Sequence, residues 1–449
     1  MSGQAWPLGG ADLARLGAMG FPLAFVALPL YVVLPHHYAN TYQLPLAWIG
    51  ALLLTARLGD ALIDPWLGRR TDGWFAQSAR VVLAGSRACA LLLVLGLVAL
   101  FFPHWWLPTP APAMGLMGVA GLALVACCLG LSLLGLAHQS WGARLGGNEA
   151  QRSRLVGWRE GLGLLGVISA SALSALWGVG AMVLAFALSL VLALWAWHHA
   201  PAPRFGKPAL PAAPCHDTAS GTGANDTPTR GMAAPLHQPV FRALLMVFVL
   251  NGIASAIPAT LVLFFVQDRL QAAPGQEAVF LAIYFCAAAL SMPAWLTAVR
   301  RWGLVRCWLL GMGLATAVFM WTLALGAGDT WAFAVVCALS GLSLGADLIA
   351  PGALLAGVVQ RLGQDQSHQG LYWGWWQVAT KLNLALAAGL ALPALQWWGY
   401  APGHSDAAGL WALSCAYGLI PCLLKVAAAL ALWQQRHTWS TPTPLENVP

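Results

Sequence analysis

The chain has 449 residues, of which 59% are apolar and 8% are charged, and its formal net charge is +7. This apolar excess excludes an ordinary soluble globular protein and indicates a polytopic membrane protein whose surroundings are the lipid bilayer. The basic residues do not gather on one polar face, which argues against a nucleic-acid partner.

Twelve apolar segments follow one another along the chain, and each is long enough to cross a bilayer as a helix. We therefore expect an all-α membrane protein with six spans in residues 1–199 and six in 239–434. A flexible linker at 200–238, rich in Pro, Ala, Gly, Thr and Ser, separates them, and a tail follows at 435–449. The spans are predicted near 13–35, 43–67, 80–102, 112–142, 155–177, 179–199, 239–267, 277–299, 304–326, 331–359, 371–398 and 408–433.

The basic residues of the loops predict the orientation of the chain, because cytoplasmic loops carry an excess of Lys and Arg. With the N-terminus inside, one loop set holds almost all of them, whereas the other holds only Arg269. We expect both termini in the cytoplasm, in a bacterial-type inner (plasma) membrane. The basic residues of the inner loops are Arg69, Arg70, Arg144, Arg152, Arg154, Arg204, Lys207, Arg230, Arg300, Arg301 and Arg361.

The second span carries three charged residues, Arg57, Asp60 and Asp64, at spacings that place them on one helix face. A charge near the bilayer centre costs roughly 3 kcal/mol, so these groups need partners in a helix bundle or a wet cavity. A cation or proton site is one interpretation, and a structural ion-pair lock is the other.

Two lysines fall within later spans. Lys381 lies several residues into the eleventh span, so we expect its ammonium to pair with Asp60 or Asp64 across the bundle. Lys425 lies nearer the cytoplasmic end of the last span, where we expect its side chain to extend towards the membrane interface.

Four further residues are candidates for substrate binding. Asp347 precedes a Pro-Gly pair in the tenth span, where a helix break or a helix-stabilising contact would both suit it. His138 and Gln139 near the end of the fourth span can bind a solute or hold helices together. Trp376 in the eleventh span offers an aromatic face for stacking on a sugar, or for packing.

A charged set at the cytoplasmic ends of the spans predicts a gate rather than a binding site. Arg159 and Glu160 begin the fifth span, and Arg69, Arg70 and Asp72 end the second. We expect these residues to form a latch between the two inner rims. The nine cysteines lie mostly in apolar runs without metal-ligand spacing, so we expect no metal site and no cofactor.

Three classes of function remain open on these residues: a cation-coupled transporter of a small molecule, a membrane enzyme and a non-transporting receptor. The outward-facing histidines His36, His37 and His104 are the candidates for an enzyme, but they form no recognisable catalytic motif. The buried charges favour the transporter.

The pattern Asp60-x3-Asp64-Pro65-x2-Gly68-x3-Asp72 resembles that of the glycoside–pentoside–hexuronide:cation symporters, the melibiose-permease branch of the major facilitator superfamily. Lys381 matches the lysine of that family's eleventh helix. The resemblance implies two six-helix bundles, a cation site at Asp60 and Asp64, and a modulating role for Lys381.

The chain also departs from that family. Pro22 and Gly135 stand about where its sugar transporters carry aspartates, so lysophospholipid-like solutes remain an alternative to a sugar or glycoside. Ile63 replaces a residue that is often polar when sodium is used, although Ser132 still offers a hydroxyl. We therefore expect proton rather than sodium coupling. We also expect the protein to be a monomer.

Overall fold

The computed structural model describes residues 8–108, 112–203, 231–273, 275–362, 369–400 and 406–436. Within these ranges the regular elements are all helices, which confirms the predicted all-α class. Residues 204–230 of the predicted linker and 437–449 of the predicted tail lie outside the described part of the chain.

The helices before the linker, here called the N-half, begin with a bent rod that forms one span. It consists of α1 (Gly10–Gly17), α2 (Gly20–Phe25), a π-helical turn (Pro29–Val33) and α3 (Leu34–Tyr42). The remaining helices are α4 (Leu46–Phe75), α5 (Ala79–Phe101), α6 (Ala113–Arg144) and α7 (Glu149–His198). Gly178 interrupts α7 with a φ of 76°, a conformation that favours glycine, so the two spans predicted on either side of it meet there.

The helices after the linker, here called the C-half, repeat this plan. They follow the short helix α8 (Ala234–His237). They are α9 (Pro239–Phe264) with a π-helical end (Phe265–Arg269), α10 (Gln276–Trp302), α11 (Leu304–Phe319), α12 (Thr330–Leu362), α13 (Gln369–Trp397), α14 (Ala407–Ser414) and α15 (Ile420–Gln434), the last two joined by a π-helical turn (Cys415–Leu419).

The helix surfaces are those of a membrane protein. In the described residues, nine helical runs have the length and composition to cross a bilayer. Helices α4, α13 and the first part of α7 pack among them. Large apolar side chains such as Leu62, Leu122 and Leu290 lie exposed, as expected for helices that face lipid.

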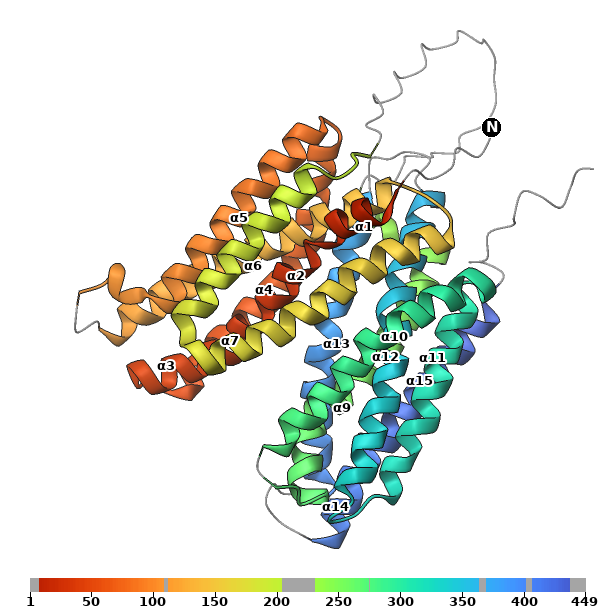
Figure 1. Ribbon diagram of the computed structural model, residues 1–449. Helices are drawn as coiled ribbons and strands as arrows, with labels where there is room; N and C mark the ends of the chain where they lie inside the picture. Colours follow the sequence, from red (N-terminus) through yellow and green to blue (C-terminus); the bar gives the residue numbers. More distant parts are fainter. Residues whose placement is uncertain are drawn as a thin grey trace, which may run out of the picture.

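The two halves meet mainly along α4 and α13 and along α7, α10 and α12 (Figure 1). We call the end of the molecule that holds Arg144, Arg152 and Arg361 the arginine-rich end. The ribbons of the halves lie close together there, near α1, and they diverge towards α3 and α14 at the opposite end (Figure 1). The contact between the halves is therefore concentrated at the arginine-rich end.

Candidate functional site

Two carboxylates of the N-half and one ammonium of the C-half form a charged cluster between the halves. Lys381 Nζ lies 2.6 Å from Asp60 Oδ2 and 2.6 Å from Asp64 Oδ2. Ser132 on α6 joins them, because its hydroxyl donates to Asp60 Oδ1 at 2.9 Å and accepts from Lys381 Nζ at 3.0 Å. The structure thus brings together four of the predicted site residues, which we call the cation cluster.

Glycines set the close approach of α4 and α13 that makes this cluster. These helices run in opposite directions, and Gly370 on α13 lies against the backbone of Gly68 on α4. One turn further on, a Cβ at Gly374 would lie 2.7 Å from the carbonyl oxygen of Asp64, so only glycine fits without a shift. Two turns beyond Gly374, Lys381 then comes level with the carboxylates of α4.

The electrostatics of the cation cluster are unbalanced. Two carboxylates share one ammonium, and the Asp64 side chain is 0% exposed whereas that of Lys381 is 26% exposed. Asp64 Oδ1 is buried and has no hydrogen-bond partner among the described residues. A buried carboxylate oxygen without a donor is costly, so it is the natural place for a cation or a proton to bind.

Arg57 makes different contacts from Asp60 and Asp64, although the sequence predicts all three on one helix face. Its guanidinium lies over the ring of Tyr31, 3.9 Å from the ring centroid. This cation–π contact within the N-half holds the charge on the aromatic face. Among the described residues, the ion pairs of Asp60 and Asp64 are formed with Lys381, and Arg57 lies beside the cation cluster without joining it.

Asp72 joins the halves at the arginine-rich end. Its Oδ1 accepts from the backbone N–H of Gly370 at 2.7 Å and from Arg144 Nη2 at 3.0 Å, and its Oδ2 accepts from the N–H of Leu371 at 3.1 Å. These N–H groups open helix α13, where a carboxylate is favoured by the helix dipole. Asp72 thereby caps a helix of the opposite half.

The other predicted gating residues do not share that contact. Arg159 pairs with its neighbour Glu160, with Nη2 at 2.5 Å from Oε1, and both lie on α7. Arg69 and Arg70 are exposed at the end of α4. The latch between the halves is instead built from Asp72 and the start of α13, so gating by the remaining residues stays a prediction.

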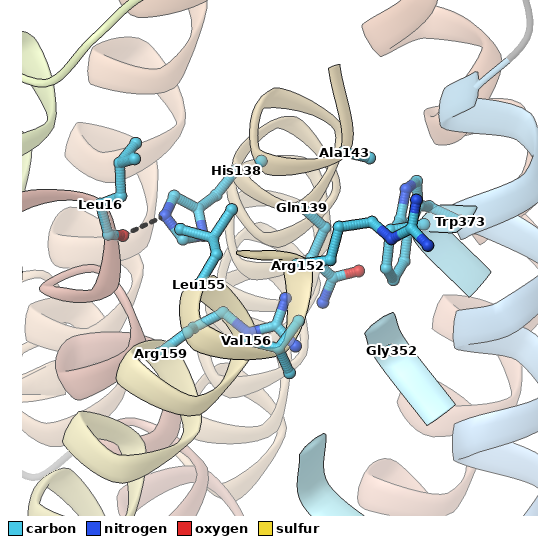
Figure 2. A pocket seen from close by; sticks show the side chains of 12 residues that line it. Leu16, His138, Gln139, Ala143, Arg152, Leu155, Val156, Arg159, Gly352 and Trp373 are labelled. Carbon is cyan, nitrogen blue, oxygen red and sulfur yellow. Dashed lines mark hydrogen bonds between the residues drawn. The ribbon is translucent and has the colours of Figure 1, made fainter. Parts of the chain in front are cut away.

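His138 and Gln139 lie apart from the cation cluster, beside a small cavity of about 30 Å³ near the arginine-rich end (Figure 2). His138 Nε2 donates to the carbonyl oxygen of Leu16 at 2.7 Å, and its ring meets Trp197 edge-on. These contacts hold His138 within the N-half. Trp376 is likewise packed, stacked on Phe248 with ring centroids 3.8 Å apart.

Asp347 lies in a second polar cluster, inside the C-half. Its Oδ2 accepts from Lys425 Nζ at 2.8 Å, and its Oδ1 accepts from Trp308 Nε1 at 2.9 Å and Asn251 Nδ2 at 3.2 Å. Lys425 Nζ also donates to Asn251 Oδ1 at 2.9 Å and to Ser255 Oγ at 3.1 Å. This network, the C-half cluster, joins α9, α11, α12 and α15.

The expectation that Lys425 extends to the membrane interface is wrong, because its side chain is 8% exposed and paired with Asp347. Sequence reasoning missed Lys425, Asn251 and Trp308 as members of one network. The available signal was a second lysine and an asparagine inside apolar runs, but no spacing along the chain relates residues of α9, α11 and α15.

A cavity of about 380 Å³ ends at the C-half cluster. Asp347, Lys425 and Ser255 line it together with hydroxyl groups of other helices, and aromatic and aliphatic side chains form most of its wall. Its lining comes from α9, α10, α11 and α12, from α15, and from the π-helical turn before α15. The cavity therefore offers one polar end and an apolar body.

No metal centre emerges from the part of the chain that the structure describes. There, no group of three or more His, Cys, Asp and Glu side chains is placed to hold a metal ion. The charged groups of the two clusters pair with lysines and neutral polar side chains instead.

The family described as MFS/sugar transport protein matches residues 15–436. No curated protein matches the sequence. Among solved structures, a bacterial homologue of the iron transporter ferroportin in an outward-facing state has a TM-score of 0.67 at 13% identity, over 95% of this chain and 98% of that one.

Two sugar transporters have a similar fold. The E. coli fucose:proton symporter has a TM-score of 0.65 at 15% identity, over 96% of this chain and 98% of that one. The proton:xylose symporter bound to 6-bromo-6-deoxy-D-glucose has a TM-score of 0.64 at 13% identity, over 96% of this chain and 98% of that one. At these identities the likeness shows a shared fold.

Proposed function

The chain belongs to the MFS/sugar transport protein family, and we propose that it is a proton-coupled symporter of a small, sugar-like organic solute that works by alternating access. Membership of the family makes the protein a multi-pass secondary transporter. The observation that carries the proposed coupling is the ion pairing of Lys381 with both Asp60 and Asp64 across the boundary between the halves.

The cation cluster accounts for coupling through the cost of buried charge. Alternating access requires the halves to move relative to one another, which separates Lys381 from the carboxylates of α4. A carboxylate left buried without a partner is strongly unfavourable. Protonation of Asp64 removes one of the two negative charges, so the loaded carrier reorients more easily than a carrier without its proton.

A proton suits this cluster better than a sodium ion. A hard metal cation needs several oxygen ligands, whereas a proton needs only one acceptor. The described neighbours of the two carboxylates offer one neutral hydroxyl, Ser132, and the ammonium of Lys381 occupies the space between them. The residue before Asp64 is the apolar Ile63. The likeness to the melibiose-permease branch rests on the same α4 motif and is part of this proposal.

The cavity of the C-half is the proposed substrate site. Its volume of about 380 Å³ falls within the range of roughly 300–1,000 Å³ typical of small-molecule sites. The three N–H groups of Lys425 are already donated within the C-half cluster, so the site offers acceptors: Asp347 Oδ2, which accepts only Lys425 in that cluster, and the hydroxyl oxygen of Thr316 can accept from solute hydroxyl groups. The site adjoins the cation cluster through α9, because Asn251 belongs to the C-half cluster while its neighbour Gly252 packs against Asn383, two residues after Lys381.

The proposed orientation of the protein in the membrane determines which conformation the structure represents. With the arginine-rich end in the cytoplasm of a bacterial-type cell, as the loop charges predict, the closed ends of the halves lie inside and the diverging ends outside. The conformation is then outward-facing, with the Asp72 contact to α13 closing the cytoplasmic side.

A second candidate substrate is a lipid-like solute such as a lysophospholipid. The observation that favours it is the wall of the C-half cavity, where Phe280, Phe285 and Phe319 lie among aliphatic side chains. An apolar wall leaves the hydroxyl groups of a bare sugar without partners, whereas it suits an acyl chain.

Proteoliposomes with an internal pH dye test the function directly. Sugars, glycosides and lysophospholipids are added in turn, in sodium-free buffer and in buffer with sodium. The proposal expects proton entry with one sugar-like compound and no requirement for sodium. Proton entry with lysophospholipids alone would select the second candidate, and a response that requires sodium would overturn proton coupling.

A further inference from the structure

The small cavity near the arginine-rich end has features that the transport proposal does not use. Figure 2 shows it between the halves, with Gln139 and Arg152 of the N-half facing Trp373 and Gly352 of the C-half. The N-half supplies α6 and α7, and the C-half supplies α12 and α13. Its lining shares no residue with the cation cluster or the C-half cluster.

Several buried polar atoms around this cavity have no partner. Arg152 Nε, Trp373 Nε1 and Gln139 Oε1 are buried and make no hydrogen bond to the described residues. Arg152 and Trp373 are N–H donors, and the Gln139 amide can present its NH₂ group after rotation, since its two ends are nearly equivalent in shape. Three potential donors therefore line a cavity with no acceptor assigned to them.

Arg152 also carries a charge that no ion pair balances. It is 6% exposed, and its Nη1 donates to two neutral oxygens, Gly147 O at 3.0 Å and Gln360 Oε1 at 2.9 Å. Within the described ranges no carboxylate lies within 4.0 Å of it. Glu149, one turn earlier, accepts instead from the N–H of Leu304 at 3.0 Å. A buried guanidinium of this kind favours an anion beside it.

We propose that this cavity binds a small monovalent anion of chloride's size. A volume of about 30 Å³ exceeds the roughly 10–15 Å³ that one water-sized occupant requires. It is too small for an organic anion such as gluconate. Arg152 supplies the charge and one donor, and Trp373 supplies a second donor from the opposite half.

The anion site exists only while the arginine-rich ends are together. Because Arg152 belongs to α7 and Trp373 to α13, separation of the halves at this end takes the two donors apart. A ligand that binds one conformation and not the other stabilises the first in proportion to its occupancy. The anion therefore holds the transporter in the conformation seen here, independently of which solute it moves.

Thermal unfolding of the purified full-length protein in detergent tests the site. The midpoint is measured in potassium chloride, potassium bromide and potassium gluconate at equal ionic strength. We expect chloride and bromide to raise it in a saturable manner, and Arg152→Gln to abolish the difference between the salts. Arg154→Gln, which removes an exposed charge two residues further on, should keep the difference.

A milder variant covers the case in which Arg152→Gln does not fold. Trp373→Phe keeps a ring in place but removes the indole N–H, so the apparent chloride dissociation constant should rise at least about tenfold, the effect of losing one hydrogen bond to a charged group. Spin labels across the arginine-rich ends should report a larger closed population in chloride than in gluconate. Equal midpoints in all three salts for the native protein, or an unchanged chloride response in Trp373→Phe, would overturn the proposal.

Discussion

Lys381 Nζ lies 2.6 Å from Asp64 Oδ2, and this contact joins a helix of the C-half to a helix of the N-half. The carboxylate is fully buried, whereas the lysine is 26% exposed. The pair therefore links two bodies that must move during transport, and one partner is accessible from outside the core. Changes at this contact should alter coupling as well as stability.

Replacement of Asp64 by Asn removes the proposed proton-binding group but keeps its size. We expect Asp64→Asn to fold and to lose proton-driven uptake, because an amide cannot take up and release the proton. Uptake of labelled solute into proteoliposomes under an imposed pH gradient measures this. Asp12→Asn changes a partly exposed carboxylate in the first turn of α1, outside the cation cluster, and is the control, which should transport normally.

Removal of the ammonium should cost stability. Lys381→Gln leaves two carboxylates without a cation, and loss of one partner of a buried ion pair typically costs about 3–5 kcal/mol. We expect the double variant Lys381→Gln/Asp64→Asn to recover part of that loss, since one uncompensated charge is gone. Unfolding midpoints of the two single variants and the double variant give the coupling energy. Additive losses would show that Lys381 and Asp64 do not interact.

Much of this site followed from sequence alone, and the reason is the cost of charge in a membrane. Because Asp60, Asp64 and Lys381 stand in apolar runs, each demanded a partner, and the carboxylates had one lysine deep enough to reach. The same logic identified Asp347 but assigned Lys425 to the interface. Position along a span does not show which way a side chain bends, and only the packing of α12 against α11 and near α15 reveals that pair.

The C-half cluster offers a test of the substrate site. Lys425→Met leaves Asp347 without its cation and should destabilise the protein by about 3–5 kcal/mol. Lys425→Met combined with Asp347→Leu should fold, because no charge is left unpaired, yet it should lose solute binding along with the polar end of the cavity. Solute binding by calorimetry and thermal unfolding separate the two effects. Unchanged affinity in the folded double variant would remove this cavity from the proposed function.

The contact of α4 with α13 should set the resting conformation. A side chain at Gly370 would strike the backbone of Gly68, so Gly370→Val should force the arginine-rich ends apart. Spin-label distances between α4 and α13 at that end report the change, and we expect them to lengthen. Gly389→Val on the same helix is the matched control, because no atom lies within 4 Å of its added Cβ.

The helix contacts between the halves were less predictable. The sequence pattern placed Asp72 in a charged latch with Arg69, Arg70, Arg159 and Glu160, whereas its partners are Arg144 and two backbone N–H groups of α13. Every helix start offers free backbone N–H groups, so the sequence does not show which of them a distant carboxylate such as Asp72 will contact. The match of Gly68 with Gly370 is equally invisible until the two helices are laid side by side.

The most direct test of proton coupling at Asp64 is solute-induced proton movement in proteoliposomes containing the native protein or the Asp64→Asn variant. A pH dye inside the vesicles follows protons while a labelled sugar-like solute is taken up. Coupling through Asp64 predicts proton entry with solute in the native protein, its abolition by a protonophore, and neither proton entry nor uphill uptake in the variant. Proton entry of equal size in the folded variant would contradict the assignment of Asp64 and, with it, the proposed coupling.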